Sequence, residues 1–199
     1  KRDRTIAYLQ KTVKKIVKAV CDTSKYLQTK GFSGVDICED VKFITTQELL
    51  DLYPSLTPKQ REYEIVKKYK TVFIMQIGDA LSDGQPHDLR APDYDDWALD
   101  GDLMFYHEVL DMALEISSMG IRVDKDSLVK QIEKSGKQER MKYAYHKMIL
   151  EDKLPLTIGG GIGQSRLCQL LLGRAHIGEV QASYWDEATV KDCKAHGVE

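Results

Sequence analysis

Apolar residues recur every three or four positions at the start of the chain, which predicts one long amphipathic helix. The helix is expected over residues 3–29, and Gly31 is expected to end it. Shorter helices are predicted after Thr46 and after Thr57-Pro58, where a capping hydroxyl precedes a first-turn proline. The apolar positions of the long helix are Ile6, Leu9, Val13, Ile16, Val17, Val20 and Leu27.

Other segments have the pattern of strands. Thr71–Ile77 is apolar throughout and partly β-branched, as is typical of a strand inside a sheet. Helices are expected after Asp124 and over Arg140–Leu150. Because the strand segments come in runs rather than in strict βαβ alternation, the pattern predicts an α+β fold with a mostly antiparallel sheet. Further strands are expected at Val41–Thr45, Asp102–Tyr106, Met112–Ser117, Ile121–Val123 and Gly178–Ala182.

Thr157–Leu172, TIGGGIGQSRLCQLLL, predicts a Gly-rich turn that leads into an apolar helix over Leu167–Leu172. Glycines let the backbone approach a ligand, and the free N–H groups at the start of a helix bind anions. Arg166 would add a cation in the first turn. The segment lacks both the P-loop lysine and the third glycine of G-x-G-x-x-G. Four glycines in five positions are unusual for a plain turn, so phosphate or nucleotide binding is favoured.

Carboxylates cluster before and within the predicted strands. Asp95 and Asp102 flank apolar residues, whereas Asp93 and Asp100 are expected to be solvated loop residues. If the strands that carry Asp102 and Glu115 pair, the two carboxylates would face one Mg²⁺ together with substrate phosphates.

Small and charged residues interrupt the strand pattern over Ser117–Val123, which reads SSMGIRV. A bulge that faces a ligand would explain this pattern, and so would an irregular sheet edge. The residues alone do not decide between the two.

The composition is that of an ordinary globular protein, with 199 residues, 42% hydrophobic, 30% charged and a net charge of −2. Near-neutral charge argues against a nucleic-acid partner, and no apolar run approaches the ~20 residues that cross a bilayer, so no membrane partner is expected. The four cysteines are far apart and form no CxxC pair, which is typical of unpaired thiols in a reducing cytoplasm. They are Cys21, Cys38, Cys168 and Cys193.

Three long segments closely resemble, in the same order, the family of ammonia-dependent asparagine synthetase A, also called aspartate–ammonia ligase. They are RAPDYDDW (Arg90–Trp97), GDLMFYHEVLDMALEISSMGIRVD (Gly101–Asp124) and LPLTIGGGIGQSRL (Leu154–Leu167). The resemblance runs from about Lys1 to Trp185. It implies a class II aminoacyl-tRNA synthetase-like fold, a homodimer, and synthesis of asparagine from aspartate, ammonia and ATP through β-aspartyl-AMP.

The resemblance also implies roles for single residues. Asp102 and Glu115 would hold Mg²⁺ and ATP, and Arg166 would contact the ATP phosphates during catalysis. Asp95 would contact the amino group of aspartate or the incoming ammonia, and we hypothesise that it binds ammonium and accepts its proton. The residues implied to line the amino-acid and adenylate pocket, or to pack under the nucleotide, are Ser117, Ser118, Arg122, Gly160 and Gly161.

The chain departs from that family in two places. Between Trp97 and Gly101 it has only Ala98–Asp100, where many members carry a longer loop, so a lid is expected to be short or absent. Members also have a long segment before the position of Lys1, so residues 1–199 are expected to be the C-terminal portion of one catalytic domain. Two alternatives stay open: the catalytic core of an aspartyl- or asparaginyl-tRNA synthetase, and a non-catalytic nucleotide-binding fragment.

Overall fold

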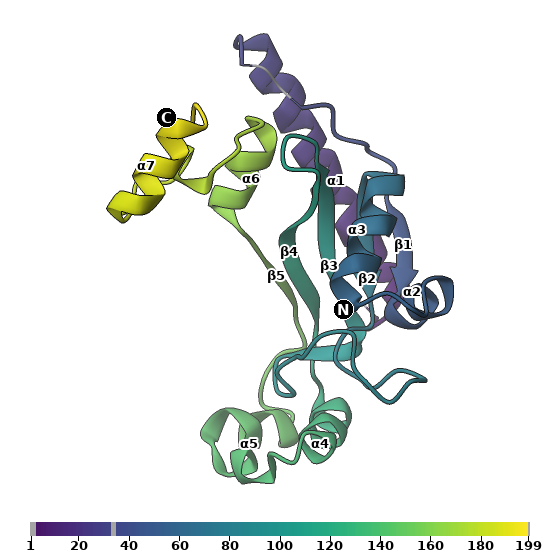
Figure 1. Ribbon diagram of the computed structural model, residues 1–199. Coiled ribbons are helices and arrows are strands. Elements are labelled where there is room, and N and C mark those ends of the chain that lie inside the picture. Colours follow the sequence, from purple (N-terminus) through teal and green to yellow (C-terminus); the bar gives the residue numbers. More distant parts are fainter. Residues whose placement is uncertain (1–2, 33–34, 199) are drawn as a thin grey trace.

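A five-stranded sheet forms the centre of the computed structural model, which describes residues 3–32 and 35–198 (Figure 1). The strands β1 and β2 are parallel, and every other neighbouring pair is antiparallel. The predicted α+β fold with a mostly antiparallel sheet is therefore confirmed. In sheet order the strands are β1 (Lys42–Thr45), β2 (Thr71–Met75), β3 (Asp95–His107), β4 (Met112–Arg122) and β5 (Ile158–Ile162). The expected domain runs from Lys1 to Glu199, and these two terminal residues lie outside the described ones.

Five of the helices among the described residues begin at polar side-chain caps that the sequence contains. Thr5 accepts a hydrogen bond from the backbone of Tyr8, and Thr45 and Thr57 each form a reciprocal capping box with the residue three positions on. None of the helices in the described part of the chain combines the length and the apolar character that crossing a bilayer requires. The helices are α1 (Ile6–Thr29), α2 (Thr46–Leu52), α3 (Pro58–Tyr69), α4 (Lys125–Lys134), α5 (Ala144–Leu150), α6 (Gln164–Leu171) and α7 (Glu187–Ala195). Those with a polar side-chain cap are α1 to α4 and α7.

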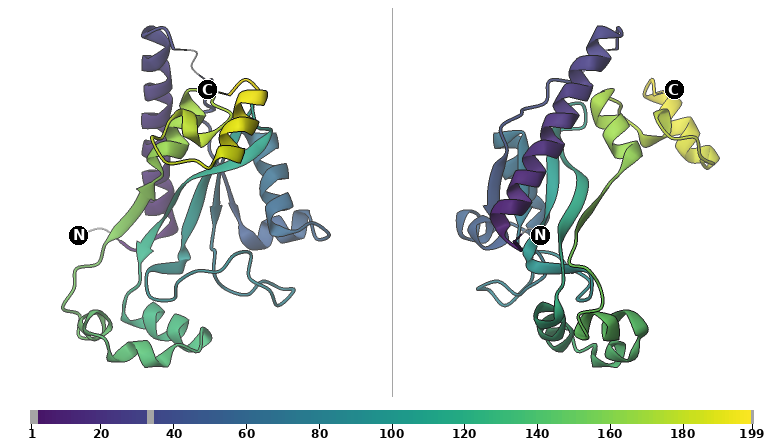
Figure 2. Two further views of the ribbon diagram at one scale, coloured as in Figure 1. Left: turned by 60° about the vertical axis from the view of Figure 1, so that its left-hand side comes forward. Right: turned by 180° about the vertical axis from the view of Figure 1, so that it is seen from behind.

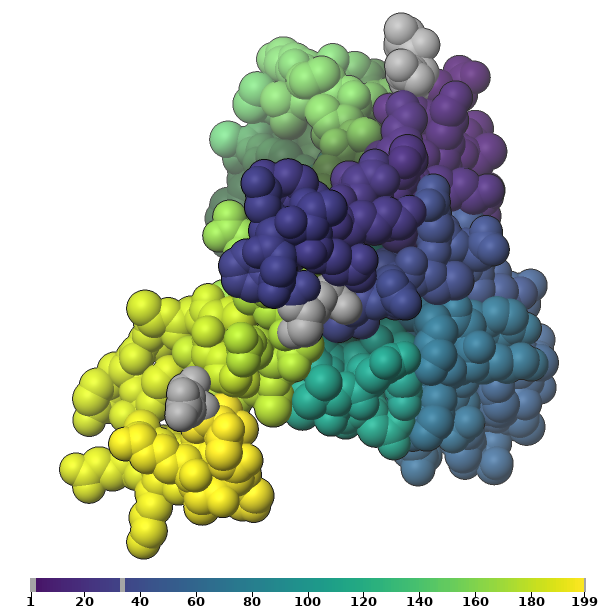
Figure 3. All heavy atoms as spheres, turned by 90° about the horizontal axis from the view of Figure 1, so that it is seen from above, coloured from purple at the N-terminus to yellow at the C-terminus, as the bar shows by residue number. Residues whose placement is uncertain are grey.

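The two faces of the sheet have different cover. On one face, which we call the α1 face, α1 packs against the strands through a buried cluster that includes Val13, Phe73 and Leu103. On the other face, which we call the site face, α2 and α3 pack against β1 and β2 through a second cluster that includes Ile65 and Ile74. Figure 2 shows α1 and α3 on opposite sides of the sheet. The helices α4 and α5 with the turn between them, which we call the α4–α5 unit, lie below the sheet in Figure 1. Helix α7 has no buried residue and extends away from the sheet near the C-terminal end of the chain (Figures 1 and 3).

One extra residue in β4 sets which side chains reach the site face. Leu103 lies opposite Ser117 and Met104 lies opposite Glu115, so Ile116 is inserted as a bulge. Residues directly opposite in a sheet point to the same face, so Glu115 follows Met104 to the site face and Ser117 follows Leu103 to the α1 face. A bulge is therefore present, immediately before the segment in which the sequence indicated an irregularity.

The Gly-rich segment is a strand, not the predicted turn. Gly160 and Gly161 of β5 pair with Met119 and Ser118 of β4. A side chain at Gly160 would overlap the Cβ of Met119, so glycine at this position lets the two strands lie close together.

Strand boundaries also differ from the prediction. β3 begins at Asp95 rather than Asp102, and β4 continues through its polar residues to Arg122, because backbone pairing with β3 and β5 does not depend on side-chain polarity. Residues 98–100, where a lid was expected to be short or absent, lie within β3. The strand predicted at Gly178–Ala182 is wrong: Ile177–Glu179 forms the 3₁₀ turn η2, closed by reciprocal bonds between His176 and Glu179. A second 3₁₀ turn, η1, spans Gln138–Lys142.

The close approach of β5 to β4 makes a testable difference between two adjacent glycines. Gly160→Ala is expected to destabilise the protein by about 1–3 kcal/mol, because its Cβ would meet Met119 Cβ and the backbone would have to shift. Gly161→Ala is the matched control, since a Cβ there meets nothing within 4 Å. Urea unfolding of both variants measures the difference, and equal midpoints would contradict it.

Candidate active site

Three neighbouring strands bring predicted residues into one row on the site face. Asp102 of β3 lies opposite Ser118 of β4, and Ser118 lies opposite Gly161 of β5. The space above Gly161 is open, so its backbone is accessible to a ligand. Ser118 and Gly161 are shared by two adjoining hollows, and the row therefore lies at the centre of the candidate site.

The two hollows differ in their walls. The first, of about 260 Å³, we call the loop pocket. The second, of about 600 Å³, we call the helix pocket. Besides the shared residues, the loop pocket is lined by Leu89, Arg90, Ala91, Tyr94, Asp95, Arg122 and Gly160. The helix pocket is lined by Glu115, Ile116, Gly163, Gln164, Ser165, Arg166, Ile177 and Gln181.

An ion pair between Asp95 and Arg122 forms one wall of the loop pocket. Arg122 also donates a 2.9 Å hydrogen bond to the Tyr94 hydroxyl, and its guanidinium carbon lies 3.8 Å from the centre of that ring. Burial raises the pKa of Asp95, although the charge of Arg122 opposes this shift. A side chain at Gly159 would overlap the guanidinium, so this glycine makes room for Arg122.

A second ion pair joins Asp102 to Arg90, a residue that the sequence analysis did not assign to the site. Asp102 is only 3% exposed, and among the described residues its Oδ1 atom has no hydrogen-bond partner. Burial is the main reason that the pKa of Asp102 is raised to about 6, and the nearby charge of Glu115 adds to it. Arg90 is the first residue of the RAPDYDDW motif, so the motif contained a signal for it.

In the helix pocket, Arg166 lies beside Glu115. Arg166 is in the first turn of α6, and its Nη1 atom donates a 3.1 Å hydrogen bond to the backbone oxygen of Glu115. The same atom lies 3.9 Å from the Glu115 carboxylate. About half of the arginine side chain is exposed, so its remaining donors are free to bind an anion in the pocket.

Two predicted residues lie differently from expectation. Ser117 is buried on the α1 face and lines neither pocket, because the bulge at Ile116 places it on the face opposite to Glu115. A side chain at Gly160 would point toward Met119 on the α1 face, so only the backbone of this residue faces the loop pocket.

The two aspartates expected to be solvated are instead held by the fold. Asp100 is 2% exposed, and its Oδ1 atom accepts a 2.8 Å hydrogen bond from the backbone of Ile77. Burial raises the pKa of Asp100 to about 8. Asp93 is partly buried and accepts hydrogen bonds from Arg140 at 2.9 Å and His146 at 3.0 Å. The expectation of a solvated acidic loop was wrong, because Asp100 lies within β3 and Asp93, just before β3, is held by η1 and α5.

The donor set on the site face fits a divalent cation shared with phosphates. No group of three or more His, Cys, Asp or Glu side chains is arranged to hold a metal ion within residues 3–32 and 35–198. Asp102, however, has a buried oxygen that no other part of the described chain hydrogen-bonds, and Glu115 lies on the same face. Two carboxylates with further oxygens from a substrate match the way in which Mg²⁺ is usually bound in proteins.

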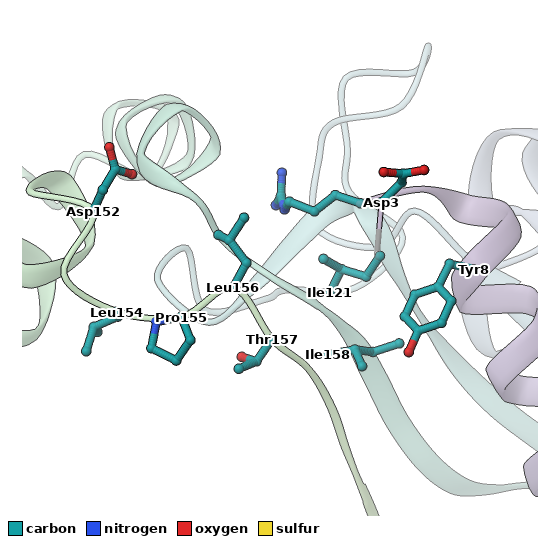
Figure 4. Close-up of a pocket in the computed structure, with 10 residues that line it drawn as sticks. Asp3, Tyr8, Ile121, Asp152, Leu154, Pro155, Leu156, Thr157 and Ile158 are labelled. Carbon is teal, nitrogen blue, oxygen red and sulfur yellow. The ribbon is translucent and has the colours of Figure 1, made fainter. Parts of the chain in front are cut away.

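A larger hollow of about 640 Å³ lies away from these residues, between the start of α1 and the segment that enters β5 (Figure 4). Its walls are mainly apolar and include Tyr8, Ile121 and Leu156. Its arginine, Arg4, is already paired with Asp96 and Asp124. We therefore assign the candidate site to the loop and helix pockets.

The fold is class II aminoacyl-tRNA synthetase-like. The structure is similar to asparaginyl-tRNA synthetase of Entamoeba histolytica in complex with asparaginyl-adenylate, with a TM-score of 0.62 and 16% identity, over 89% of this chain and 44% of that chain. It is also similar to aspartyl tRNA synthetase of the same organism, with a TM-score of 0.51 and 18% identity, over 74% of this chain and 32% of that chain. At these identities the similarity shows the fold alone.

The chain belongs to the aspartate–ammonia ligase family, described as "AsnA: Aspartate-ammonia ligase", which it matches over residues 1–197. It is 51% identical over 205 residues to the aspartate–ammonia ligase of Ruminiclostridium cellulolyticum, covering 100% of this chain and 60% of that protein. It is 55% identical over 197 residues to that of Lactobacillus johnsonii, covering 98% of this chain and 59% of that protein. The chain thus spans about three fifths of the length of these relatives.

The buried Asp100 carboxyl predicts a specific pH dependence of stability. Because the pKa of Asp100 is about 8 in the folded chain and about 4 when unfolded, the folded form holds a proton that the unfolded form releases between these values. The contribution of the Asp100 carboxyl to the free energy of unfolding therefore falls as pH rises from about 4 to about 8. Asp100→Asn keeps the oxygen that accepts from Ile77 and removes the titration.

We expect Asp100→Asn to unfold at nearly the same temperature as the wild type at pH 4, close to the pKa of the unfolded side chain. At pH 8 we expect it to be more stable by several kcal/mol, since each pH unit inside the window contributes about 1.4 kcal/mol. Thermal unfolding across this pH range measures the difference, with the exposed Asp40→Asn as control. A difference that does not change with pH would contradict the burial of an ionisable group.

Proposed function

We propose that this chain supplies a nucleotide-binding and amide-forming part of an enzyme that makes asparagine from aspartate, ammonia and ATP, with release of AMP and pyrophosphate. The observation that carries the proposal is the gathering of three carboxylate–arginine pairs around the open backbone of Gly161. Membership of the aspartate–ammonia ligase family supports it. The pairs are Asp95–Arg122, Asp102–Arg90 and Glu115–Arg166.

The first step would activate the side-chain carboxylate of aspartate, which is itself a poor electrophile. One of its oxygens attacks the α-phosphorus of ATP, a new P–O bond forms, and the bond to pyrophosphate breaks to give β-aspartyl-AMP. Arg166 would stabilise the charge that develops on the phosphate oxygens, and the free N–H groups at the start of α6 would assist it. The open backbone at Gly161 would let the phosphates approach the sheet.

Asp102 and Glu115 are the residues that would hold Mg²⁺ in this site. When bound, Mg²⁺ supplies positive charge to the phosphate oxygens of ATP. Arg90 would keep the Asp102 carboxylate oriented through their ion pair and would leave its other oxygen available as a ligand.

In the second step, ammonia would attack the carbonyl carbon of β-aspartyl-AMP. A C–N bond forms, the C–O bond to AMP breaks, and the nitrogen loses a proton. Asp95 would bind ammonium and accept a proton from it, and the raised pKa of this carboxyl favours that role. Ser118 and Arg122 would line the amino-acid side of the loop pocket.

The proposal extends to setting and assembly. We place the activity in the cytoplasm, since the four cysteines, all within the described residues, are free. We further propose a homodimer, as the family resemblance implies, with no nucleic acid among the partners.

The decisive experiment supplies the protein that carries this chain with ATP and aspartate, and with either ammonia or tRNA as acceptor. Asparagine and AMP formed with ammonia would support the proposal. Aminoacylated tRNA would instead favour a tRNA synthetase, which has the same fold. Binding of ATP without AMP formation from either acceptor would contradict both and favour a non-catalytic nucleotide-binding protein.

Arg166→Ala is expected to lower turnover by roughly 10²–10³, the usual cost of removing one donor that stabilises charge in a transition state. Arg174→Ala is a matched control, because the Arg174 side chain is as exposed as that of Arg166 but pairs with Glu179 outside both pockets. Steady-state AMP release measures the effect. Equal losses in the two variants would show that Arg166 does not face the phosphates.

Asp95→Asn is expected to lower turnover with ammonia by about 10²-fold or more at saturating aspartate, because an amide cannot accept the ammonium proton. Asparagine formation is measured across a range of ammonia concentrations, with Asp126→Asn on the surface of α4 as control. Full turnover in Asp95→Asn would remove this residue from the ammonia step.

A further inference from the structure

The backbone that carries Asp95 is held from outside the site by one buried side chain, Gln131 of α4. Its Nε2 atom donates hydrogen bonds to the backbone oxygens of Pro92 and Asp95, each at 3.0 Å. Its Oε1 atom accepts from the backbone nitrogen of Trp97 at 2.9 Å. Both donor hydrogens and the acceptor oxygen of this amide are therefore used.

These bonds lie where the sheet itself does not hold the chain. Asp95 lies opposite Arg122 of β4, but the next pair in register is Asp100 with Gly120, so residues 96–99 of β3 have no partner on β4. A strand segment outside the ladder needs other partners for its buried backbone groups. Gln131 supplies an acceptor to the backbone N–H of Trp97 and also donates to the backbone oxygen of Asp95.

Other groups of the same helical unit fix the residues just before Asp95. Asp93 accepts hydrogen bonds from Arg140 of η1 and from His146 of α5. The Nδ1 atom of His146 is buried without a partner, so the Asp93 contact is the polar contact that the ring makes among the described residues. The α4–α5 unit, which lies below the sheet in Figure 1, thus contacts the Asp95 segment through Gln131, Arg140 and His146.

We propose that Gln131 is a positioning residue that acts through Asp95, by holding the backbone on both sides of this carboxylate so that it meets both Arg122 and the substrate. The inference rests on the proposed function to the extent that Asp95 is taken to contact ammonia. Positioning matters in such a step because a displacement of about 1 Å in a reacting group costs on the order of 10² in rate.

Gln131→Met tests the proposal, since methionine has nearly the same shape and makes none of the three hydrogen bonds. We expect kcat/KM for ammonia to fall by roughly 10–100-fold while KM for ATP changes by less than about twofold. Gln138→Met, at an exposed position of η1, is the matched control and is expected to change neither constant.

The double variant separates positioning from general loosening. If Gln131 acts through Asp95, then Gln131→Met adds little to the loss already caused by Asp95→Asn, and the two effects are far from additive. Additive losses would overturn the proposal. A rise in the KM for ATP as large as the fall in kcat/KM for ammonia would also overturn it, because the loss of function would then extend over both pockets.

Backbone hydrogen exchange keeps the inference testable if the proposed function fails. Wild-type protein that forms no asparagine would contradict the function but not the placement of Asp95. Gln131→Met is then expected to speed exchange over residues 92–97 by at least about tenfold relative to Gln138→Met, since the Trp97 N–H loses its acceptor. Unchanged exchange in that segment would overturn the positioning role.

Discussion

The close approach of β5 to β4 is the constraint on which the site depends. Three glycines in a row make it possible, and each serves a different purpose. At Gly160 the missing side chain makes room for Met119 on the α1 face, and at Gly159 it makes room for the guanidinium of Arg122 on the site face. At Gly161 it leaves the space above the strand open. Side chains at these positions would separate the strands, displace the arginine or fill the site.

The buried carboxylates of the candidate site lower the stability of the folded protein. Asp95, Asp100 and Asp102 are buried side by side on or near β3, and burial raises the pKa of each. Arg90 and Arg122 offset part of this cost by forming ion pairs with Asp102 and Asp95. A surface of this kind is less stable than an apolar one, and it presents oriented charges to a ligand without further rearrangement.

The segment that walls the loop pocket is fixed at both ends by buried polar contacts with helices. The Nε2 atom of His87 lies 3.1 Å from the Oε1 atom of Glu62 in α3, and Asp93 is hydrogen-bonded to His146 of α5. Between these two contacts the segment carries Arg90, and it leads directly into Asp95. Helices that lie far apart in the sequence therefore set the geometry of one short segment beside the loop pocket.

The sequence by itself predicted helices α1 to α6, the buried strand β2 and the α+β class, but not helix α7, and its motifs supplied the residues of the proposed chemistry. Helix periodicity, capping threonines and long motifs are local signals. Asp95, Glu115, Ser118 and Arg166 line the two pockets, and Asp102 lies opposite Ser118 in the sheet. Only the tertiary structure decided which face each side chain meets. The bulge at Ile116 places Ser117 on the α1 face. The Gly-rich segment that was predicted to be a turn forms strand β5, because it pairs with β4. Register and burial depend on neighbours distant in the chain, and for that reason no local pattern revealed Arg90 as the partner of Asp102, or Gln131 as the support of Asp95.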